Sequence, residues 1–311
     1  MWVRVSSTGT GTLTITKSDT KTVANAVAGK IGDTKNLSAT LKRKPDSAPL
    51  AVKTLTFKVN GVSVGTANTD ANGKATLSYK IDESLGTGAQ SLTVEYAGGD
   101  FYNASTGTAA LTVSKADSSV SVASVSPRYI GDTKNLTATL TRKSDKLALS
   151  GRTLTFKIDG TAIGTANTDG AGKATLSYKI DEGLGLGAHT LTVEFSGDAN
   201  YNSSTGSTAL TIKQTPTKLT IGSVSGKVGS TVYFKAKLLR SSDNAPLEGR
   251  TVRFQIDGLD VGAGVTDGSG LAVLAYVIPN TLSAGVHTIT ALFDGDTLYL
   301  SSSSSATLTV K

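Results

Sequence analysis

The chain contains no cysteine and is poor in several other residue types. Without cysteine it has no disulfides, no thiolate nucleophile and no cysteine-ligated metal. Methionine and tryptophan occur once each, and aromatic residues make up 5% of the 311 residues. No run of about 18 consecutive apolar residues is present, so no membrane span is predicted. The opening residues MWVRVSSTG lack the apolar core of a signal peptide, so we expect no export signal within this sequence.

The formal net charge of +7 is small for a chain of this length. Basic clusters at 42–44 and 142–143 stand close to Asp46 and Asp145. A nucleic-acid groove normally interleaves basic and aromatic side chains, and these clusters contain no aromatic residue. We therefore interpret them as solvated loop charge and expect no nucleic-acid partner.

Threonine, serine, glycine and valine dominate the chain and are arranged in a long repeat. The string IGDTKNLSATLKRK at 31–44 returns as IGDTKNLTATLTRK at 130–143. From Phe57 to Phe156 the offset is 99 residues, and from Phe156 to Phe254 it is 98. Such a period predicts stacked copies of one domain. We divide the chain into a leading segment (1–17), repeat 1 (18–115), repeat 2 (116–214) and repeat 3 (215–311).

Apolar and polar residues alternate along each repeat, as in TLTFKVNG at 54–61. A period of two predicts strands with one buried face, and Asn60-Gly61 and similar pairs are typical of hairpin turns. About seven strands in about 98 residues, without helical periodicity, predict an all-β fold of three immunoglobulin-like β-sandwiches. The joints are short, and Pro216 stiffens the second. We therefore expect an extended rod, with one extra N-terminal strand in the leading segment.

Two strings point to a known family. GAHTLTVEFSGDANYNSS at 187–204 and TDANGKATLSY at 69–79 resemble the bacterial immunoglobulin-like repeat family, and the resemblance covers essentially the whole chain. Repeats of this family occur in tandem in surface-exposed and secreted prokaryotic proteins, including adhesins, stalk proteins and phage structural proteins. The resemblance implies the β-sandwich fold, an extracellular or cell-surface location and a structural role, with no cofactor.

The two histidines, His189 and His287, occupy the same repeat position, where repeat 1 has Gln90. They lie one domain apart, roughly 30–40 Å if strands of eight to ten residues set the domain length. They are therefore unable to share a metal, and we interpret them as residues that begin a strand. No catalytic, cofactor-binding or metal-binding residue is predicted, and we expect the protein not to be an enzyme.

Aspartates recur in loops, and we interpret them as turn formers. One set lies in the pattern TDxxG and another precedes recurring tyrosines: Asp70, Asp169 and Asp267; Asp100, Asp198 and Asp296. Each loop offers too few carboxylates for calcium, which takes about six to eight oxygens. Calcium bound between loops of neighbouring domains remains an open alternative.

The tyrosines Tyr102, Tyr201 and Tyr299 recur between the last two strands of each repeat. In β-sandwiches a tyrosine near such a corner often bonds to the backbone across the loop, so we predict a structural role. Four glycosylation sequons also occur, and they matter only in a host that glycosylates such sites: Asn36, Asn103, Asn135 and Asn202.

The leading segment contains VSSTGTGTLTITK at 5–17, which resembles the closing strings of repeats 1 and 2 at 103–115 and 202–214. A lone strand is unstable in water, and three interpretations remain open. The chain was cut from a longer array, or the segment folds back on repeat 1, or it pairs with a sheet of the next molecule and builds a head-to-tail filament. The candidate intermolecular strand comprises Trp2, Val3, Val5, Leu13 and Ile15.

These observations predict an extracellular structural protein, a stalk segment or a filament subunit. Its expected partners are copies of itself or neighbouring repeats of a longer chain. The alternative is a cell-surface adhesin or carbohydrate-binding module with a glycan or protein receptor. That function needs an exposed aromatic platform, whereas Phe57, Tyr79 and Tyr96 fall on inward positions of their strands.

Overall fold

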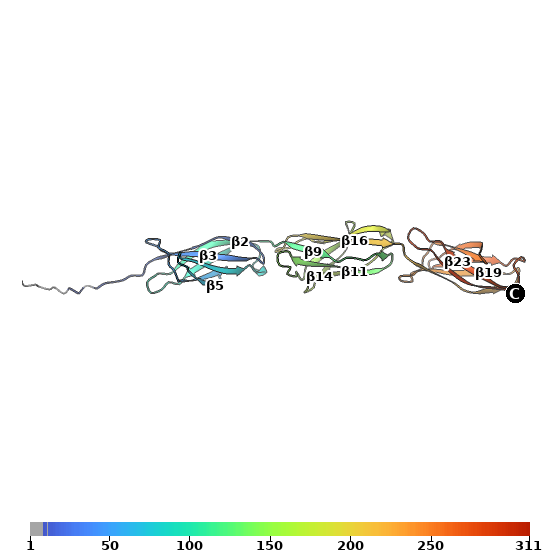
Figure 1. Ribbon diagram of the computed structural model, residues 1–311, viewed down its shortest axis with the longest axis horizontal. Coiled ribbons are helices and arrows are strands. Elements are labelled where there is room, and N and C mark those ends of the chain that lie inside the picture. The colour runs from blue at the N-terminus through green and yellow to red at the C-terminus, as the bar shows by residue number, and fades with distance from the viewer. Residues whose placement is uncertain (1–8, 11) are drawn as a thin grey trace, which may run out of the picture. The chain divides into compact units, whose positions relative to one another are not determined.

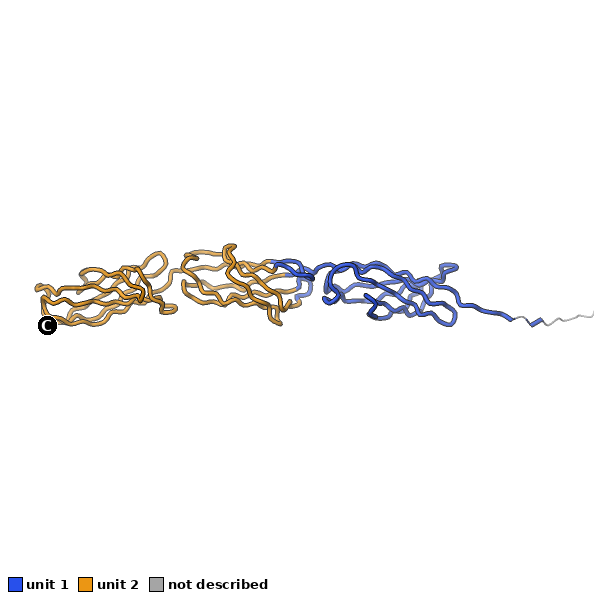
Figure 2. Tube along the Cα trace, turned by 180° about the vertical axis from the view of Figure 1, so that it is seen from behind, with its two compact units in different colours: residues 1–118, 142–146, 196–204 blue, residues 119–141, 147–195, 205–311 orange. Residues whose placement is uncertain are grey.

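The computed structural model describes residues 9, 10 and 12–311. Figure 2 shows the chain divided into two compact units. Unit 1 holds repeat 1 with residues 116–118, 142–146 and 196–204 of repeat 2, and unit 2 holds the rest of repeat 2 with repeat 3. The part of the chain that the structure describes holds no helix of the length and hydropathy that a membrane crossing requires.

Repeat 1 forms a three-stranded sheet in the order β1-β3-β6 and a five-stranded sheet in the order β2-β8-β7-β4-β5. Figure 1 labels β2, β3 and β5 of this repeat. β2 pairs with β8 in parallel, and the other pairs are antiparallel. The elements are β1 (Thr20–Ala24), β2 (Val27–Lys30), β3 (Thr34–Arg43), β4 (Thr54–Val59), β5 (Val62–Asn68), β6 (Lys74–Lys80), the 3₁₀ helix η1 (Glu83–Leu85), β7 (Gly88–Tyr96) and β8 (Ser105–Ser114).

Repeat 2 has the same strand orders, β14-β11-β9 and β10-β16-β15-β12-β13. Its elements are β9 (Ser118–Val122), β10 (Arg128–Tyr129), β11 (Thr133–Arg142), β12 (Thr153–Ile158), β13 (Thr161–Asn167), β14 (Lys173–Lys179), the 3₁₀ helix η2 (Glu182–Leu184), β15 (Gly187–Phe195) and β16 (Ser204–Lys213).

Repeat 3 follows the same plan, with the orders β17-β19-β22 and β18-β24-β23-β20-β21. Its elements are β17 (Thr217–Ile221), β18 (Val224–Gly226), β19 (Thr231–Arg240), β20 (Thr251–Ile256), β21 (Leu259–Val265), β22 (Leu271–Val277), β23 (Gly285–Phe293) and β24 (Ser302–Val310). The 3₁₀ helix that follows the sixth strand of repeats 1 and 2 is replaced here by a single turn, in which the amide of Leu282 donates to the carbonyl of Pro279 at 3.1 Å.

The alternation in the sequence determines which side chains enter the core. In β4, Leu55, Phe57 and Val59 are buried while the residues between them are more exposed. The following hairpin turns through Asn60 and Gly61, at φ values of 48° and 80°. Two successive positive φ values define the tight turn that matches the twist of paired strands, as the Asn-Gly pair predicts.

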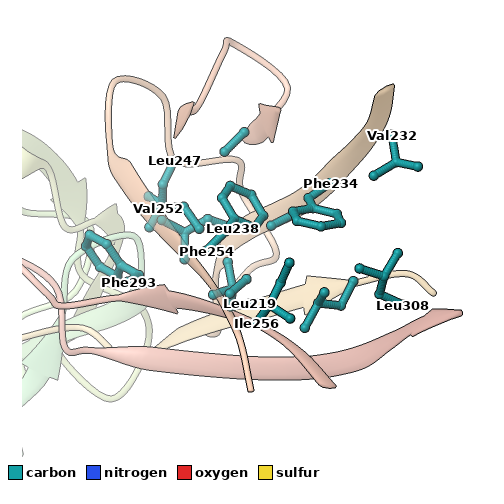
Figure 3. Close-up of a cluster of buried hydrophobic side chains, with 14 of the residues drawn as sticks. Leu219, Val232, Phe234, Leu238, Leu247, Val252, Phe254, Ile256, Phe293 and Leu308 are labelled. Carbon is teal, nitrogen blue, oxygen red and sulfur yellow. The ribbon is translucent and has the colours of Figure 1, made fainter. Parts of the chain in front are cut away.

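Each core lies between its two sheets, and repeat 3 is an example. Figure 3 shows Phe234 of β19 and Phe254 of β20 among the other buried apolar side chains of this repeat. The centroids of these two rings are 6.0 Å apart, and Tyr276 stacks on Phe234 with centroids 5.4 Å apart. Strands of both sheets therefore contribute to one apolar layer, which is the arrangement of an immunoglobulin-like sandwich. The all-β class and the three tandem sandwiches predicted from the sequence are confirmed.

The leading segment differs from the expectation of an extra strand. Residues 12–17 lie outside strands, and Leu13 and Ile15 are 84% and 75% exposed. Bridging to repeat 1 begins only at Ser18, which pairs with Tyr102. Residues 12–17 are exposed and pair with no strand in the described part of the chain, so these six residues do not form the extra edge strand. Trp2, Val3 and Val5 lie outside the described residues.

Candidate functional site

The histidines hold hairpin turns. Nδ1 of His189 lies 2.7 Å from Oδ2 of Asp159, and Nδ1 of His287 lies 2.6 Å from Oδ2 of Asp257. Both aspartates are the first residue of a two-residue hairpin loop. In repeat 1 the same bridge is neutral, because the amide of Asn60 donates to Oε1 of Gln90 at 2.8 Å. Each histidine thus pairs with an aspartate of its own repeat.

The first set of aspartates closes turns between strands. Oδ1 of Asp70 accepts hydrogen bonds from the amides of Asn72 and Lys74, at 2.8 and 2.9 Å. Asp169 and Asp267 make the same pair of bonds. No group of three or more histidine or acidic side chains that could hold a metal ion occurs among the described residues.

The aspartates that precede the recurring tyrosines do not all have the same role. Oδ1 of Asp198 accepts from the amides of Asn200 and Tyr201, and Asp296 does the same before Tyr299. Asp100 stands one residue closer to its tyrosine than these two do, so Gly99 takes the turn position in repeat 1. A shift of one residue moves the carboxylate out of reach of the turn amides.

The recurring tyrosines connect one repeat to the one before it. Tyr201 and Tyr299 are fully buried, whereas Tyr102 is only half-buried. The hydroxyl of Tyr201 donates to Oε2 of Glu83 at 3.2 Å, and that of Tyr299 donates to Oε1 of Glu182. Each tyrosine lies in the same compact unit as its glutamate. Both hydroxyls therefore bond to a carboxylate of the preceding repeat.

A buried arginine stands beside each of these tyrosine–glutamate pairs. The guanidinium of Arg240 donates from Nε and Nη2 to the two oxygens of Asp243, both at 2.8 Å. Its Nη1 lies 3.8 Å from Oε1 of Glu182. Arg142 makes the same fork with Asp145, at 2.9 and 2.6 Å, and its side chain is only 4% exposed. A fork to a carboxylate fixes the plane of the guanidinium and leaves its remaining face for the neighbouring repeat.

A glycine of the preceding repeat covers each arginine. A Cβ placed on Gly131 would lie 2.3 Å from Nε of Arg240, and one on Gly32 would lie 2.1 Å from Nη1 of Arg142. Both glycines have φ of +86°, a conformation that side chains rarely adopt. We call the cluster of glycine, glutamate, arginine and tyrosine the joint cluster; its members are Gly32, Glu83, Arg142 and Tyr201 in unit 1, and Gly131, Glu182, Arg240 and Tyr299 in unit 2.

The ionisable groups in and beside the unit 2 joint cluster shift one another's pKa values. Hydrogen bonding to Asp243 raises the pKa of Arg240, and the same bonds hold the pKa of the Asp243 carboxyl below its usual range. Burial, with the nearby Glu182, raises the pKa of Tyr299 to about 12. At neutral pH the tyrosine therefore stays a hydrogen-bond donor and the arginine stays a cation.

The interpretation of the basic cluster at 142–143 as solvated loop charge is wrong for Arg142, whose side chain is buried because the preceding repeat covers it. The sequence nevertheless contains a signal for the arginines and the glutamates. The pattern R-x-x-D recurs as RKPD at 43–46, RKSD at 142–145 and RSSD at 240–243. A glutamate follows the sixth strand at the same place in repeats 1 and 2. Repetition at a fixed offset shows that these residues share a role, but only the tertiary structure shows that they meet.

The outer surface of the second joint has a different chemistry from that of the first. In unit 1, Nζ of Lys30 lies 2.7 Å from Oδ2 of Asp117, whose other oxygen accepts from the amide of Asn202. In unit 2 the partly exposed Tyr129 and Leu300 line a shallow pocket at the corresponding place. The joint cluster is thus common to both joints, while its surroundings are polar in one and apolar in the other.

The profile of one protein family, described as bacterial Ig-like domain (group 3), matches residues 22–114, 120–213 and 219–311. The chain belongs to this family. It consists of three copies of the bacterial Ig-like domain in tandem, as the resemblance in the sequence predicted. No curated protein matches the chain as a relative.

Several solved structures are similar to this bacterial Ig-like chain. A tetra-tandem repeat from the extending region of a large adhesion protein is 19% identical, with a TM-score of 0.37 over 94% of this chain and 74% of that one. The Escherichia coli adhesin FdeC is 16% identical, with a TM-score of 0.33 over 94% and 96% of the two chains. Domains A168–A170 of titin are 10% identical, with a TM-score of 0.41 over 93% and 97%. Because every one of these scores is below 0.5, the assignment depends on the family profile.

Proposed function

We propose that this chain is a spacer segment of a bacterial surface protein, in which the joint clusters hold successive Ig-like domains in a fixed orientation. The observation that carries the proposal is the recurrence of the same four-residue cluster at both joints. A buried arginine forked to an aspartate and covered by a glycine without a side chain leaves little room for bending. The role is mechanical, and no catalytic step is proposed.

The supporting chemistry is that of a charge-assisted network. Hydrogen bonds to charged groups contribute about 1.5–3 kcal/mol when shielded from solvent, and less when exposed. At the second joint Arg240 is 9% exposed and Glu182 is 50% exposed, so the arginine end of the cluster is the better shielded. We therefore expect each joint to resist bending without being as stable as the sandwich core.

Small-angle X-ray scattering of the full chain tests this proposal. We expect the extended shape predicted from the sequence, with a single narrow distribution of end-to-end lengths. The double variant Glu83→Ala, Glu182→Ala should broaden that distribution while each domain stays folded. Asn280→Ala, at the same position of repeat 3, is the matched control and should leave it unchanged. A wild-type chain that is as flexible as the double variant would contradict the proposal.

We also propose that the leading segment pairs with a sheet of another molecule, which would link spacer segments end to end. Leu13 and Ile15 are exposed and unpaired, and they alternate as the apolar residues of a strand do. An extended segment of this kind can add to an exposed sheet edge of a second copy and build a head-to-tail filament.

Deleting residues 1–17 tests strand pairing directly. Electron microscopy of the purified full chain should show filaments, and the deletion should show single particles. The variant Leu13→Lys, Ile15→Lys keeps the chain length and should also abolish filaments. Filaments that persist in both variants, or a full chain that forms none, would rule out strand donation.

An adhesive role is the second candidate, and one surface of repeat 3 favours it. Tyr233, Val273 and Val277 are exposed on β19 and β22, where the matching positions of repeats 1 and 2 are polar. An exposed aromatic ring beside apolar side chains is the platform that carbohydrate recognition requires. Glycan-array binding that Tyr233→Ala removes would support this role, and an array without hits would count against it.

A further inference from the structure

Repeat 1 carries half of a joint cluster at the end where its own tyrosine lies. Arg43 donates from Nε to Oδ1 of Asp46 at 2.9 Å, and Nη2 bonds to the other oxygen, the same fork that Arg142 and Arg240 make. Tyr102 stands at the position of Tyr201 and Tyr299. Within the described residues this end has no glutamate and no covering glycine from another repeat.

Arg43 is accordingly more exposed than the arginines of the two complete joint clusters. The side chain of Arg43 is 40% exposed, against 4% for Arg142 and 9% for Arg240. The guanidinium is held in the orientation that it has in the complete clusters, yet it faces solvent. Orienting a long cationic side chain costs conformational entropy. In repeats 2 and 3 the contact with the preceding repeat offsets that cost.

The surroundings of Arg43 also differ from those of Arg142 in repeat 2. Val52 and Phe101 are 79% and 69% exposed at this end. Their counterparts in repeat 2 are Gly151 and Asn200. An open pocket of about 410 Å³ lies beside them, lined by residues that include Lys53, Tyr96 and Tyr102. Nζ of Lys53 lies 5.5 Å from the centre of the Tyr102 ring.

We infer that this end of repeat 1, formed by Arg43, Tyr102, Val52 and Phe101, is a docking surface for the carboxyl-terminal end of another Ig-like domain of the repeat 1 type. The inference rests on the proposed spacer function. The partner supplies a glutamate that binds between Arg43 and Tyr102 and a glycine turn that covers the guanidinium. Val52 and Phe101 add an apolar contact whose counterparts at the first joint within this chain, Gly151 and Asn200, do not provide one.

Repeat 3 of a second copy is a poor partner for this surface. Asn280 stands where Glu83 and Glu182 stand in the first two repeats, and Pro279 replaces the aspartate before them. In repeats 1 and 2 that aspartate accepts a hydrogen bond from the amide two residues on and caps the 3₁₀ turn bearing the glutamate. The end of repeat 3 therefore lacks the carboxylate and the aspartate cap, although a single turn remains, closed by the hydrogen bond from the amide of Leu282 to the carbonyl of Pro279 at 3.1 Å.

An added domain tests the inference. In the longer chain, a second copy of residues 18–115 replaces residues 1–17, so that its last strand runs directly into Ser18 as repeat 1 runs into repeat 2. Hydrogen exchange at 99–103 and nitration of Tyr102 by tetranitromethane report on the surface. We expect both to slow by about tenfold, toward the behaviour of the matching segment around Tyr201.

Two matched chains make the result specific. An added copy that carries Glu83→Gln, and an added repeat 3 (residues 215–311) in place of the added repeat 1, should each protect Tyr102 less. Hydrogen exchange over the added domain shows that it is folded in every chain. Tyr102 that reacts equally fast with and without the added repeat 1 would overturn the inference, as would equal protection by all three added domains.

This outcome is distinct from failure of the spacer function. If scattering shows stiff joints within the chain while Tyr102 stays reactive, the docking surface is wrong and the spacer function stands. If Glu83→Gln in the original chain leaves the exchange at Tyr201 unchanged, the joint cluster itself carries no coupling, and both proposals fail.

Discussion

The hydroxyl of Tyr201 donates a hydrogen bond to Oε2 of Glu83, a residue 118 positions earlier in the chain. The tyrosine is fully buried, and the carboxylate belongs to the preceding domain. A bond of this kind couples the end of one sandwich to the start of the next. Because the same bond recurs between Tyr299 and Glu182, its consequences can be measured at two places in one molecule.

The glycine that covers Arg240 should be the least tolerant residue of the second joint. Gly131→Ala places a Cβ against the guanidinium, whereas Gly229→Ala has the same type of backbone, with φ of +79°, and nothing within 4 Å. We expect Gly229→Ala to cost about 1 kcal/mol through φ alone. We expect Gly131→Ala to cost about 1–2 kcal/mol more, because the arginine must move from its partners. Denaturant unfolding measures both, and equal costs would contradict the packing argument.

The phenol of Tyr299 should make the second joint sensitive to alkali. Its pKa is raised to about 12, chiefly by burial, while an unfolded tyrosine ionises near pH 10. The folded state then holds the proton more tightly, so stability is full below about pH 10 and falls as pH rises toward 12. Tyr299→Phe should remove this decline from unfolding curves measured across that range.

The alkaline effect has an internal control. Glu182→Gln removes the carboxylate charge but keeps Tyr299 buried, so the spectroscopic titration of this tyrosine should move to lower pH without reaching that of an exposed phenol. An unchanged titration would mean that the carboxylate does not act on the hydroxyl.

His287 should give repeat 3 a pH dependence that repeat 1 lacks. Hydrogen bonding to Asp257 raises the pKa of this histidine. Its contribution to stability is therefore full below the unfolded value of about 6.5 and is lost as pH rises through the folded value. His287→Gln should flatten the stability profile of repeat 3 between about pH 5 and 8. Gln90→Ala, in the uncharged bridge of repeat 1, should change no such profile.

Val52 should be a source of strain in repeat 1. It has φ of 54°, whereas the matching Gly151 and Gly249 reach 68° and 71° without a side chain. The left-handed region costs a residue with a Cβ about 1–2 kcal/mol, and a β-branched residue suffers most. Part of the gain from Val52→Gly is offset by the chain entropy of glycine, so we expect about 1 kcal/mol of added stability. The reverse change, Gly151→Val, should destabilise repeat 2, and thermal unfolding tests both.

The sequence by itself determined the domain type and the turns. Alternation along residues such as Leu55, Phe57 and Val59 depends only on the two-residue period of a strand, so the buried face can be read without coordinates. The pair Asn60-Gly61 defined its turn for a similarly local reason, because few residues accept positive φ. The number and order of the repeats followed from strings that return at a fixed offset.

The tertiary structure decided what the repeated residues do. The bond from Tyr201 to Glu83 joins residues of different domains, and no local propensity relates them. The same holds for Gly131 and Arg240, whose contact depends on how one sandwich end meets the next. The leading segment is the converse case, since its alternation predicts a strand but a strand also needs a partner edge. Local pattern therefore determined the domains, and long-range contact determined the joints.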